Sequence, residues 1–328
     1  ETSGAMSQTA SRGGRSDETL FRIESVAMKN VVTGAPVGGQ LSAKAVQEVQ
    51  VVTGGYQADR GQAISGVVDV EMKEPGQEWR STLEYQGGSY DTERLFVQTE
   101  GKEPVTGALL PALGLRVPGT VGILVGLDML STDTYLPSSR YASNFVGERR
   151  TLRSGYGMSF LGLDWTYDDF LRLRQRNTAN LYAKLTWKAT PRHKVNLTLT
   201  KFSAEDHGFA RYRVGDESLS ASSSSTAYAW NFRDQMDQYP TFTEDTNAQI
   251  LTWKYAISNV AYSAVSVSHF FNDARQAVQG KSWSEYNVWR EPGRDQYFIA
   301  DENGDYPYFQ DLYMDRWSAA GSYTRHWH

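Results

Sequence analysis

The chain has 328 residues, a formal net charge of −5 and no cysteine, with 40% apolar and 12% aromatic residues. Without cysteine, disulfides, zinc–thiolate sites and cysteine nucleophiles are excluded. Mild acidity without basic clusters argues against nucleic-acid binding. No run of about 18 uninterrupted apolar residues occurs, which excludes a transmembrane helix. A transmembrane barrel alternates apolar and polar side chains and needs no such run. A soluble all-β protein also favours Tyr, Trp and Thr, so composition leaves both classes open.

The first 76 residues contain three strand-like runs separated by glycine-rich segments. Residues 1–18 are polar, and Thr19–Glu24 reads as a strand. Val46–Thr53 and Val67–Met72 are β-rich runs on either side of a connector that contains Gly54, Gly55 and Gly61. Alternation of apolar and polar residues predicts strands with one buried face. The glycines predict sharp turns or close backbone approach, with φ > 0 or a neighbouring backbone expected at Gly54 and Gly61.

An ordered set of residues in this region is similar to the plug domain of TonB-dependent outer-membrane receptors. The matching residues are Glu48, Val49, Gly54, Gly55, Ala58, Gly61, Ala63, Gly66, Val67, Val68 and Lys73, with Arg60 beside Gly61. Upstream, Arg12, Gly13, Gly14, Arg15 and Glu18 resemble the family's R-G-G-R-x-x-E motif. Ser25 stands where the family turn has glycine. Residues 30–34, 103–107 and 109–114 resemble the Oar-like, carboxypeptidase-regulatory-linked branch.

Beyond Glu78 the period-2 pattern becomes regular and predicts a run of antiparallel strands. The segment Gly87–Asp91 predicts the first turn. The expected strands are 78–86, one from Leu95, Val121–Leu130, a hairpin over Asn180–Thr200, a second hairpin from Gln249–Tyr255 to Ala261–Phe271, and one from Arg316 to Tyr323. About eight strands are expected in all.

Loop lengths separate the two ends of these strands. Thr190–His193 and Ile257–Asn259 are tight turns, whereas the long stretches at the opposite end cover about 132–177, 206–245 and 273–314. Short periplasmic turns opposite long extracellular loops are typical of a transmembrane barrel. Two connections break this rule: 87–92 is short and 101–120 is long.

The hairpin over 180–200 predicts two chemically distinct faces. Leu181, Leu185, Trp187, Val195, Leu197 and Leu199 are expected to face lipid. Lys184, Thr186 and Thr198 are expected to face the lumen.

No catalytic constellation is visible, so no enzyme and no cofactor are expected. His326 and His328 have i, i+2 spacing but no third ligand. Asp301, Asn303 and Asp305 have the first spacings of a calcium loop, but Tyr306 stands where glycine is needed and Leu312 where the bidentate glutamate is needed. A plain acidic loop is therefore preferred, and no metal site is predicted.

One long loop is rich in aromatic residues, which predicts either a ligand surface or a small core of the loop itself. The residues concerned are Trp283, Tyr286, Trp289, Tyr297, Tyr306 and Tyr308, with Phe298 and Phe309. The family resemblance also implies that Arg12 and Arg15 pair with barrel-wall carboxylates, for which Glu84, Glu100 and Glu48 are the candidates. An exposed polar loop is the alternative for the two arginines.

Taken together, these features predict a mainly β fold: a partial plug domain (small mixed α/β) in 1–76, then the N-terminal strands of a large antiparallel transmembrane β-barrel in 77–328. The resemblance implies a receptor in the outer membrane of a Gram-negative bacterium. Its expected function is TonB-energised uptake of a scarce siderophore, cobalamin, glycan or peptide. The implied partners are outer-membrane lipid, the TonB–ExbB–ExbD complex and the unknown substrate. A plugged barrel for surface assembly or secretion, and a soluble β protein that binds glycans, are the alternatives.

Overall fold

The computed structural model describes residues 19–28, 41–53, 66–102, 118–134, 159–160, 163–164, 170–207, 236–287, 289–290, 297–298, 304–306 and 308–325. Its small sheet contains β1 (Thr19–Ile23), β2 (Val26–Ala27), β3 (Val46–Val52) and β4 (Gly66–Met72). Its large sheet contains β5 (Arg80–Gly88), β6 (Thr92–Lys102), β7 (Thr120–Thr132), β10 (Arg176–Thr190), β11 (His193–Asp206), β12 (Thr241–Ser258), β13 (Ala261–Ala277) and β16 (Gln310–Arg325). Two ribbons pair β8 (Ser159–Phe160) with β9 (Leu163–Asp164), and β14 (Trp289–Arg290) with β15 (Tyr297–Phe298).

Helical structure in the described part of the chain is limited to short 3-10 turns. They are η3 (Ala43–Ala45), η10 (Met236–Gln238), η11 (Val278–Gly280) and η12 (Trp283–Glu285). The α component expected beside the small sheet is therefore not seen within these ranges. None of the helices described is long and apolar enough to cross a membrane.

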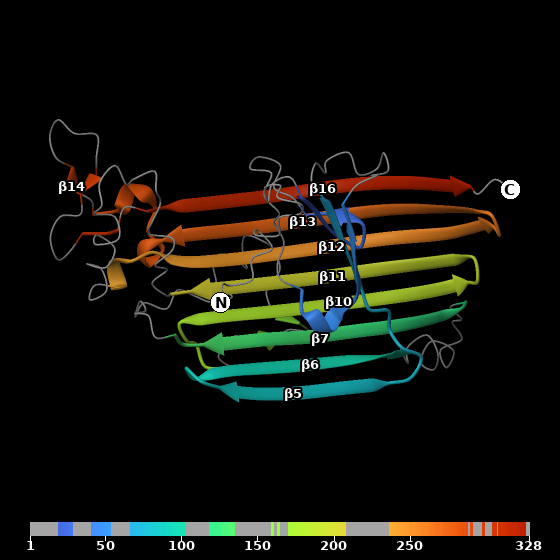
Figure 1. The fold of residues 1–328 in the computed structure, drawn as a ribbon, viewed down its shortest axis with the longest axis horizontal. Coiled ribbons are helices and arrows are strands. Elements are labelled where there is room, and N and C mark those ends of the chain that lie inside the picture. Colours follow the sequence, from blue (N-terminus) through green and yellow to red (C-terminus); the bar gives the residue numbers. More distant parts are fainter. Residues whose placement is uncertain are drawn as a thin grey trace.

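The large sheet, called the wall below, is an antiparallel meander in which each strand pairs with its neighbours in the chain (Figure 1). Its eight strands agree with the number expected from the sequence. Tight turns join β10 to β11 and β12 to β13 at one end, and the long connections 133–175, 207–240 and 278–309 lie at the other. The short β5–β6 turn and the long β6–β7 connection, which are the two expected exceptions to the loop-length rule, are also present.

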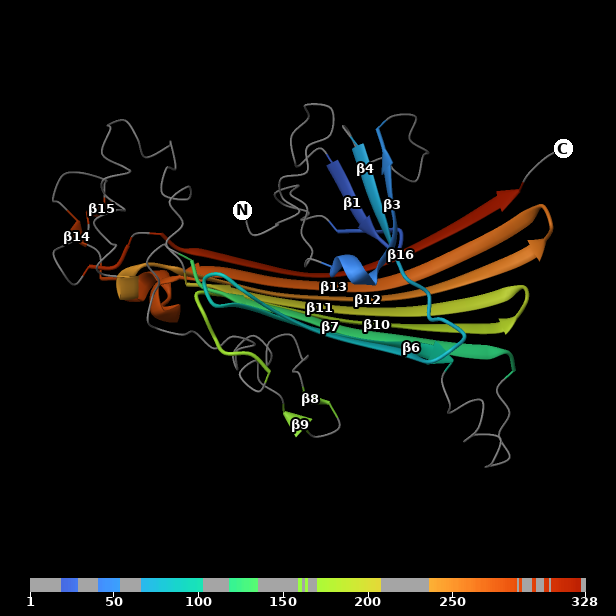
Figure 2. The same ribbon diagram turned by 60° about the horizontal axis from the view of Figure 1, so that its bottom comes forward.

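The two faces of the wall differ in chemistry. Lys184 is 3% exposed on the face that carries the small sheet, whereas Leu185 is 37% exposed on the other. We call these the inner and outer faces (Figure 2). The outer face of this hairpin exposes Leu181, Leu185 and Leu199, and it also carries the register pairs Leu185–Leu197 and Trp187–Val195. The inner face buries Lys184, Thr186 and Thr198. The separation of the faces is as expected; contact with lipid stays a prediction.

Apolar side chains of the outer face form a diagonal band. On β10 this face is apolar from Trp187 to Ala179 and becomes polar at Asn177. On β12 it is apolar at Trp253 and already polar at Gln249, which lies in register with Leu199 and so with the apolar part of β10. A diagonal band is expected where strands tilt by about 35–45° from the membrane normal.

The small sheet has the order β2-β1-β4-β3, with β1 and β4 parallel. The expectation that each strand buries one face is wrong for β3 and β4. Val67, Val68 and Val70 of β4 are all buried because β4 is flanked on both edges and packs on both faces. Val49 and Val51 of β3 are exposed because β3 is an edge strand. Burial here depends on position in the sheet more than on alternation.

The first turn of the wall lies within the predicted segment Gly87–Asp91 but is shorter. Gly87 and Gly88 belong to β5, and the reversal is made by Ser89, Tyr90 and Asp91. Tyr90 and Asp91 have φ of 58° and 50°, the left-handed region that glycine adopts most easily. A turn with two such residues matches the twist of the flanking strands. The prediction therefore contained the turn but began it two residues too early.

We expect Leu185→Arg in the full-length protein to destabilise it by about 2–4 kcal/mol, because a cation on the apolar face near the bilayer midplane loses its hydration. Leu185→Ala is the control for lost contacts, and its cost should be clearly smaller. Reversible unfolding in lipid vesicles measures both. Equal costs for the two variants would contradict a lipid-facing Leu185.

Candidate functional site: the interface between the small sheet and the wall

Two apolar clusters seat the small sheet on the inner face of the wall (Figure 2). In the first, Phe21 and Val70 belong to a buried group that includes Ile250 and Phe270 of the wall. The second cluster contains Ala45 and Met72 of the small sheet's segment, and Leu124 and Tyr182 of the wall. The small sheet thus contacts β7 and β10 through one cluster, and β12 and β13 through the other.

The most buried charge of this interface is Lys184 on β10. Its Nζ donates to Glu24 Oε1 at 2.8 Å and to the Met72 carbonyl at 2.9 Å. Glu24 Oε1 also accepts from the Met72 amide at 2.9 Å. An ammonium group this buried requires a good partner, since an uncompensated charge in a protein interior costs several kcal/mol. The three groups therefore fix the position of the β1–β2 turn against β10.

The β1–β2 turn that presents Glu24 has an uncommon backbone. Glu24 and Ser25 have φ of 49° and 68°, and Ile23 pairs with Val26 across them. Ser25 thus adopts the conformation that glycine takes easily, at a cost of about 1–2 kcal/mol for a non-glycine residue. The Arg22 guanidinium donates to the Ser25 carbonyl at 3.0 and 2.6 Å. Ser25, the residue that departs from the glycine of the resembled motif, therefore lies in a left-handed turn.

A second polar contact joins η3 to β6 and β7. Ser42 Oγ donates to Asp128 Oδ2 at 2.6 Å, and Arg94 binds both oxygens of Asp128 at 2.8 and 2.7 Å. Lys44 forms an ion pair with Glu84 of β5. Sequence reasoning missed these contacts of η3, although it named Glu84 as a wall carboxylate that receives a cation.

Several predicted site residues lie outside the described ranges: Arg12, Gly13, Gly14, Arg15, Glu18, Gly54, Gly55, Arg60 and Gly61. Their pairing and backbone conformations stay predictions. Gly66 is described as the first residue of β4, paired with Thr19. Glu100 is half-buried on β6, and Glu48 is exposed on β3.

Tyr182 shapes the inner face under the small sheet. Its hydroxyl donates to Gln98 Oε1 at 2.9 Å. A Cβ placed on Gly126 would lie 2.2 Å from the Tyr182 ring. Any side chain at Gly126 would therefore displace the tyrosine, and with it the surface on which Met72 and Ala45 pack.

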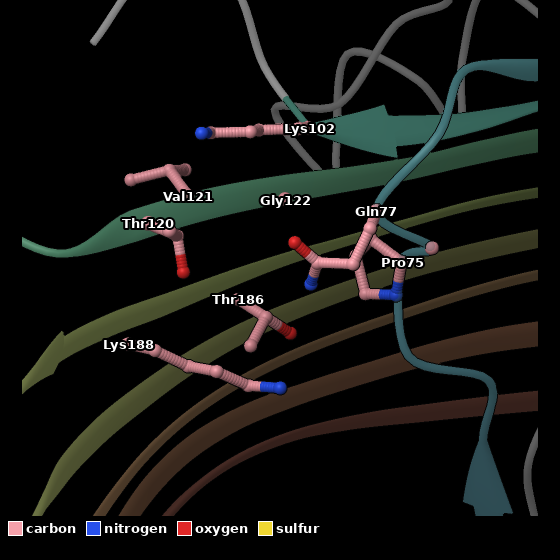
Figure 3. A pocket seen from close by; sticks show the side chains of 9 residues that line it. Pro75, Gln77, Lys102, Thr120, Val121, Gly122, Thr186 and Lys188 are labelled. Atoms are coloured by element: carbon pink, nitrogen blue, oxygen red, sulfur yellow. The ribbon is translucent and has the colours of Figure 1, made fainter. Parts of the chain in front are cut away.

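The segment that connects the small sheet to β5 is bound to the wall by lysines. Glu74 pairs with Lys194, and with Lys188 at 3.5 Å. Pro75 packs against Gly122, and a hollow of about 10 Å³, roughly one water in size, lies beside them (Figure 3). Burial raises the pKa of Glu74, but the hydrogen bond from Lys194 and the charges of Lys194, Lys188 and Lys184 outweigh it, so the pKa lies below its ordinary 4.5.

The aromatic loop packs in part on itself. The Tyr286 hydroxyl accepts from the Val278 amide at 2.7 Å and donates to the Tyr308 carbonyl at 2.9 Å. Burial raises the pKa of Tyr286 to about 12. Tyr306 contacts Tyr239 at a ring distance of 5.1 Å, whereas Trp283 is 38% exposed. The side chains of Trp289 and Tyr297 lie outside the described set, and a ligand role for this loop stays a prediction.

Asp305, the described member of the weak calcium candidate, is already fully engaged. Its two oxygens accept from Lys281 Nζ at 2.8 and 2.9 Å, and Oδ2 also accepts from the Asn287 amide at 2.7 Å. Asp301 and Asn303 lie outside the described residues, as do His326 and His328. Within the described ranges, no three His, Asp or Glu side chains gather as a metal-binding group.

Comparison with known proteins gives the class of fold. The ferric-catecholate import receptor Fiu from E. coli K12 matches with a TM-score of 0.52 at 9% identity, over 97% of this chain and 41% of that one. The ferripyoverdine receptor of the Pseudomonas aeruginosa outer membrane matches with a TM-score of 0.50 at 12% identity, over 86% of this chain and 30% of that one. No protein-family model and no curated protein sequence matches.

The chain therefore has the fold of part of a TonB-dependent outer-membrane receptor. It spans less than half the length of either matched structure. The Oar-like branch stays a prediction.

We expect Lys184→Met to destabilise the seating of the small sheet by about 3–5 kcal/mol, since it leaves the Glu24 carboxylate buried without its cation. The double variant Glu24→Gln/Lys184→Met should recover most of this loss, because the neutral amide introduced at position 24 can still accept from the Met72 amide. Hydrogen exchange at the Met72 amide in the full-length protein measures both effects. Equal exchange in the single and double variants would show that the pair is not coupled.

The lowered pKa of Glu74 gives a pH prediction. A carboxyl with a depressed folded pKa contributes stability above its unfolded pKa, and the contribution is lost as pH falls through the folded pKa. The connecting segment should therefore loosen below about pH 4.5. Hydrogen exchange of residues 74–77, corrected for intrinsic rates, should show this step. Glu74→Gln should abolish it, and Glu78→Gln, at an exposed neighbour, should retain it; a step that survives Glu74→Gln would refute the assignment.

Proposed function

We propose that this chain is the plug and first barrel strands of a receptor for TonB-energised uptake across the outer membrane of a Gram-negative bacterium. In this proposal residues 1–76 form the C-terminal part of the plug and residues 77–328 form part of a closed barrel. The outer face of the wall contacts lipid, and the long connections are extracellular. Coupling to the TonB–ExbB–ExbD complex is assigned from the resemblance.

The observation that carries the proposal is the seating of the small sheet on a polar inner face. The wall binds it through Lys184, Asp128 and two lysines on Glu74, beside limited apolar clusters. When water can enter the interface, hydrogen bonds and ion pairs between the small sheet and the wall can be replaced by hydrogen bonds to water at a small net free-energy cost. A unit held in this way can leave the wall and return, which a transport plug must do and a continuous apolar core would prevent.

The outer face supports the membrane location. Large apolar side chains that would be unfavourable in water are exposed there across the wall, among them Leu83, Leu185, Leu251, Val267 and Trp317. A contiguous apolar surface of this kind marks a contact with lipid or protein. A soluble glycan-binding sheet has no need for it.

For the substrate, ferric chelates form the first class to test, because the two matched structures are named for ferric-catecholate import and for ferripyoverdine. Cobalamin, glycans and peptides form the second class, since one receptor scaffold serves many ligands.

The test compares a strain that lacks the gene with one that expresses the full-length protein. Uptake of iron-55 as catecholate, pyoverdine-type and citrate chelates is measured in both, and labelled cobalamin serves as the second class. The proposal predicts that one probe accumulates only with the protein present and that a proton uncoupler stops its uptake. Uptake that continues in the presence of the uncoupler would contradict the proposal. Loss of a surface protein from the strain that lacks the gene, without any change in uptake, would also contradict it and would favour a role in assembly or secretion.

A further inference from the structure

A large cavity separates the small sheet from one side of the wall. It has a volume of about 460 Å³ and lies between the β1–β2 hairpin and strands β12, β13 and β16. Its wall side is lined by four serines, Ser266, Ser268, Ser318 and Ser322. Ala320 lies between Ser318 and Ser322 on β16, and Ala264 pairs with Ser322. Register confirms that these residues adjoin: Ser268 pairs with Ser318, and Ser266 with Ala320.

The cavity exists because the inner face of the wall has small side chains there and large side chains under the rest of the small sheet. Toward β7 and β10, Leu124 and Tyr182 fill the space under the small sheet, and Lys184 and Asp128 bind it. Toward β13 and β16, serine and alanine leave the space open and present hydroxyl groups to it.

Positive charge dominates the open side. Arg22 and Glu24 on the cavity are paired with Asp69 and Lys184. Lys254 and Arg316 also line the cavity, where Glu71 is the remaining carboxylate.

Beside the cavity, a row of three lysines crosses the inner face near its tight-turn end. Lys188, Lys194 and Lys254 lie in one cross-strand line, because Lys194 pairs in register with both others. Glu74 is the carboxylate that binds the first two. Cations therefore outnumber carboxylates from the cavity to the end of the wall.

We propose that this cavity is a binding site for an anionic, hydrophilic solute and the side on which such a solute passes the plug. Serine hydroxyls replace part of the hydration of the solute, and Lys254 with Arg316 supplies the attraction. The plug keeps its contacts with β7 and β10. The gap along β13 and β16 widens when the hydrogen bond from Arg316 to the Ala27 carbonyl and the apolar contacts of Phe270 are released. The passage role rests on the proposed uptake function; the anion preference of the cavity does not.

The 328 residues contain no cysteine, so one introduced thiol reports on one place once any cysteine elsewhere in the full-length protein has been replaced by serine. Ser318→Cys in the purified full-length protein is treated with anionic and cationic methanethiosulfonates of similar size. Both rates are normalised to those of free mercaptoethanol. The anionic reagent should be favoured by about tenfold, and Lys254→Gln should reduce that preference at least threefold.

Two matched variants control this measurement. Lys102→Gln removes an equal charge away from the cavity and should leave the preference unchanged. Ser263→Cys, on the outer face of β13, should show no preference. A reagent ratio near one at Ser318→Cys, no reaction there, or equal effects of Lys254→Gln and Lys102→Gln would overturn the anion site.

The passage is tested separately in cells, with the probe that the uptake experiment identifies. Ser318→Trp should fill the cavity and lower the uptake rate about tenfold without loss of cell-surface binding, whereas Ala319→Trp, one residue away on the outer face, should not. Equal uptake by the two variants would overturn the passage and leave the uptake function standing. Failure of every uptake probe would refute the proposed function, and the thiol measurement would still decide the anion site.

Discussion

The arrangement of the whole molecule depends on one buried ammonium group. Lys184 projects from the inner face of β10 and meets Glu24 and the Met72 carbonyl, all within 2.9 Å. To supply that carboxylate, the β1–β2 turn adopts a left-handed backbone at two residues that are not glycine. Arg22 holds the same turn from the other side. Because removal of one partner from a buried pair costs far more than the intact pair contributes to stability, this contact fixes register and orientation more than it adds stability.

Sequence periodicity predicted the wall well because its physical cause is local. A strand with lipid or solvent on one side and a polar interior on the other must alternate, and the alternation assigned Leu185 and Lys184 to opposite faces correctly. Loop lengths likewise placed the long connections at one end. The same reasoning failed for β4, whose side chains are buried on both faces of the small sheet. It began the first turn of the wall two residues early, because Gly87 and Gly88 continue β5 and the reversal lies at Tyr90 and Asp91.

The pairings that define the site could not be predicted in this way. Lys184 and Glu24 are 160 residues apart in the chain. Alternation shows that Lys184 faces inward but carries no information on which carboxylate it meets. Likewise, Ser42 and Asp128 meet only because η3 lies on β7. The cavity beside β16 has a fainter signal, a row of alternate serine and alanine residues, whose meaning appears only when the small sheet is placed opposite them.

The central claim is that the small sheet lies on the inner face of the wall in the full-length protein. A Ser42→Cys/Asp128→Cys variant, in native outer membranes, tests it most directly with a short bifunctional thiosulfonate. The account predicts an efficient cross-link between these positions, identified by mass spectrometry, and none for Ser42→Cys with Leu127→Cys, whose side chain faces outward. Cross-linking to Leu127 in place of Asp128, or to neither, would contradict it.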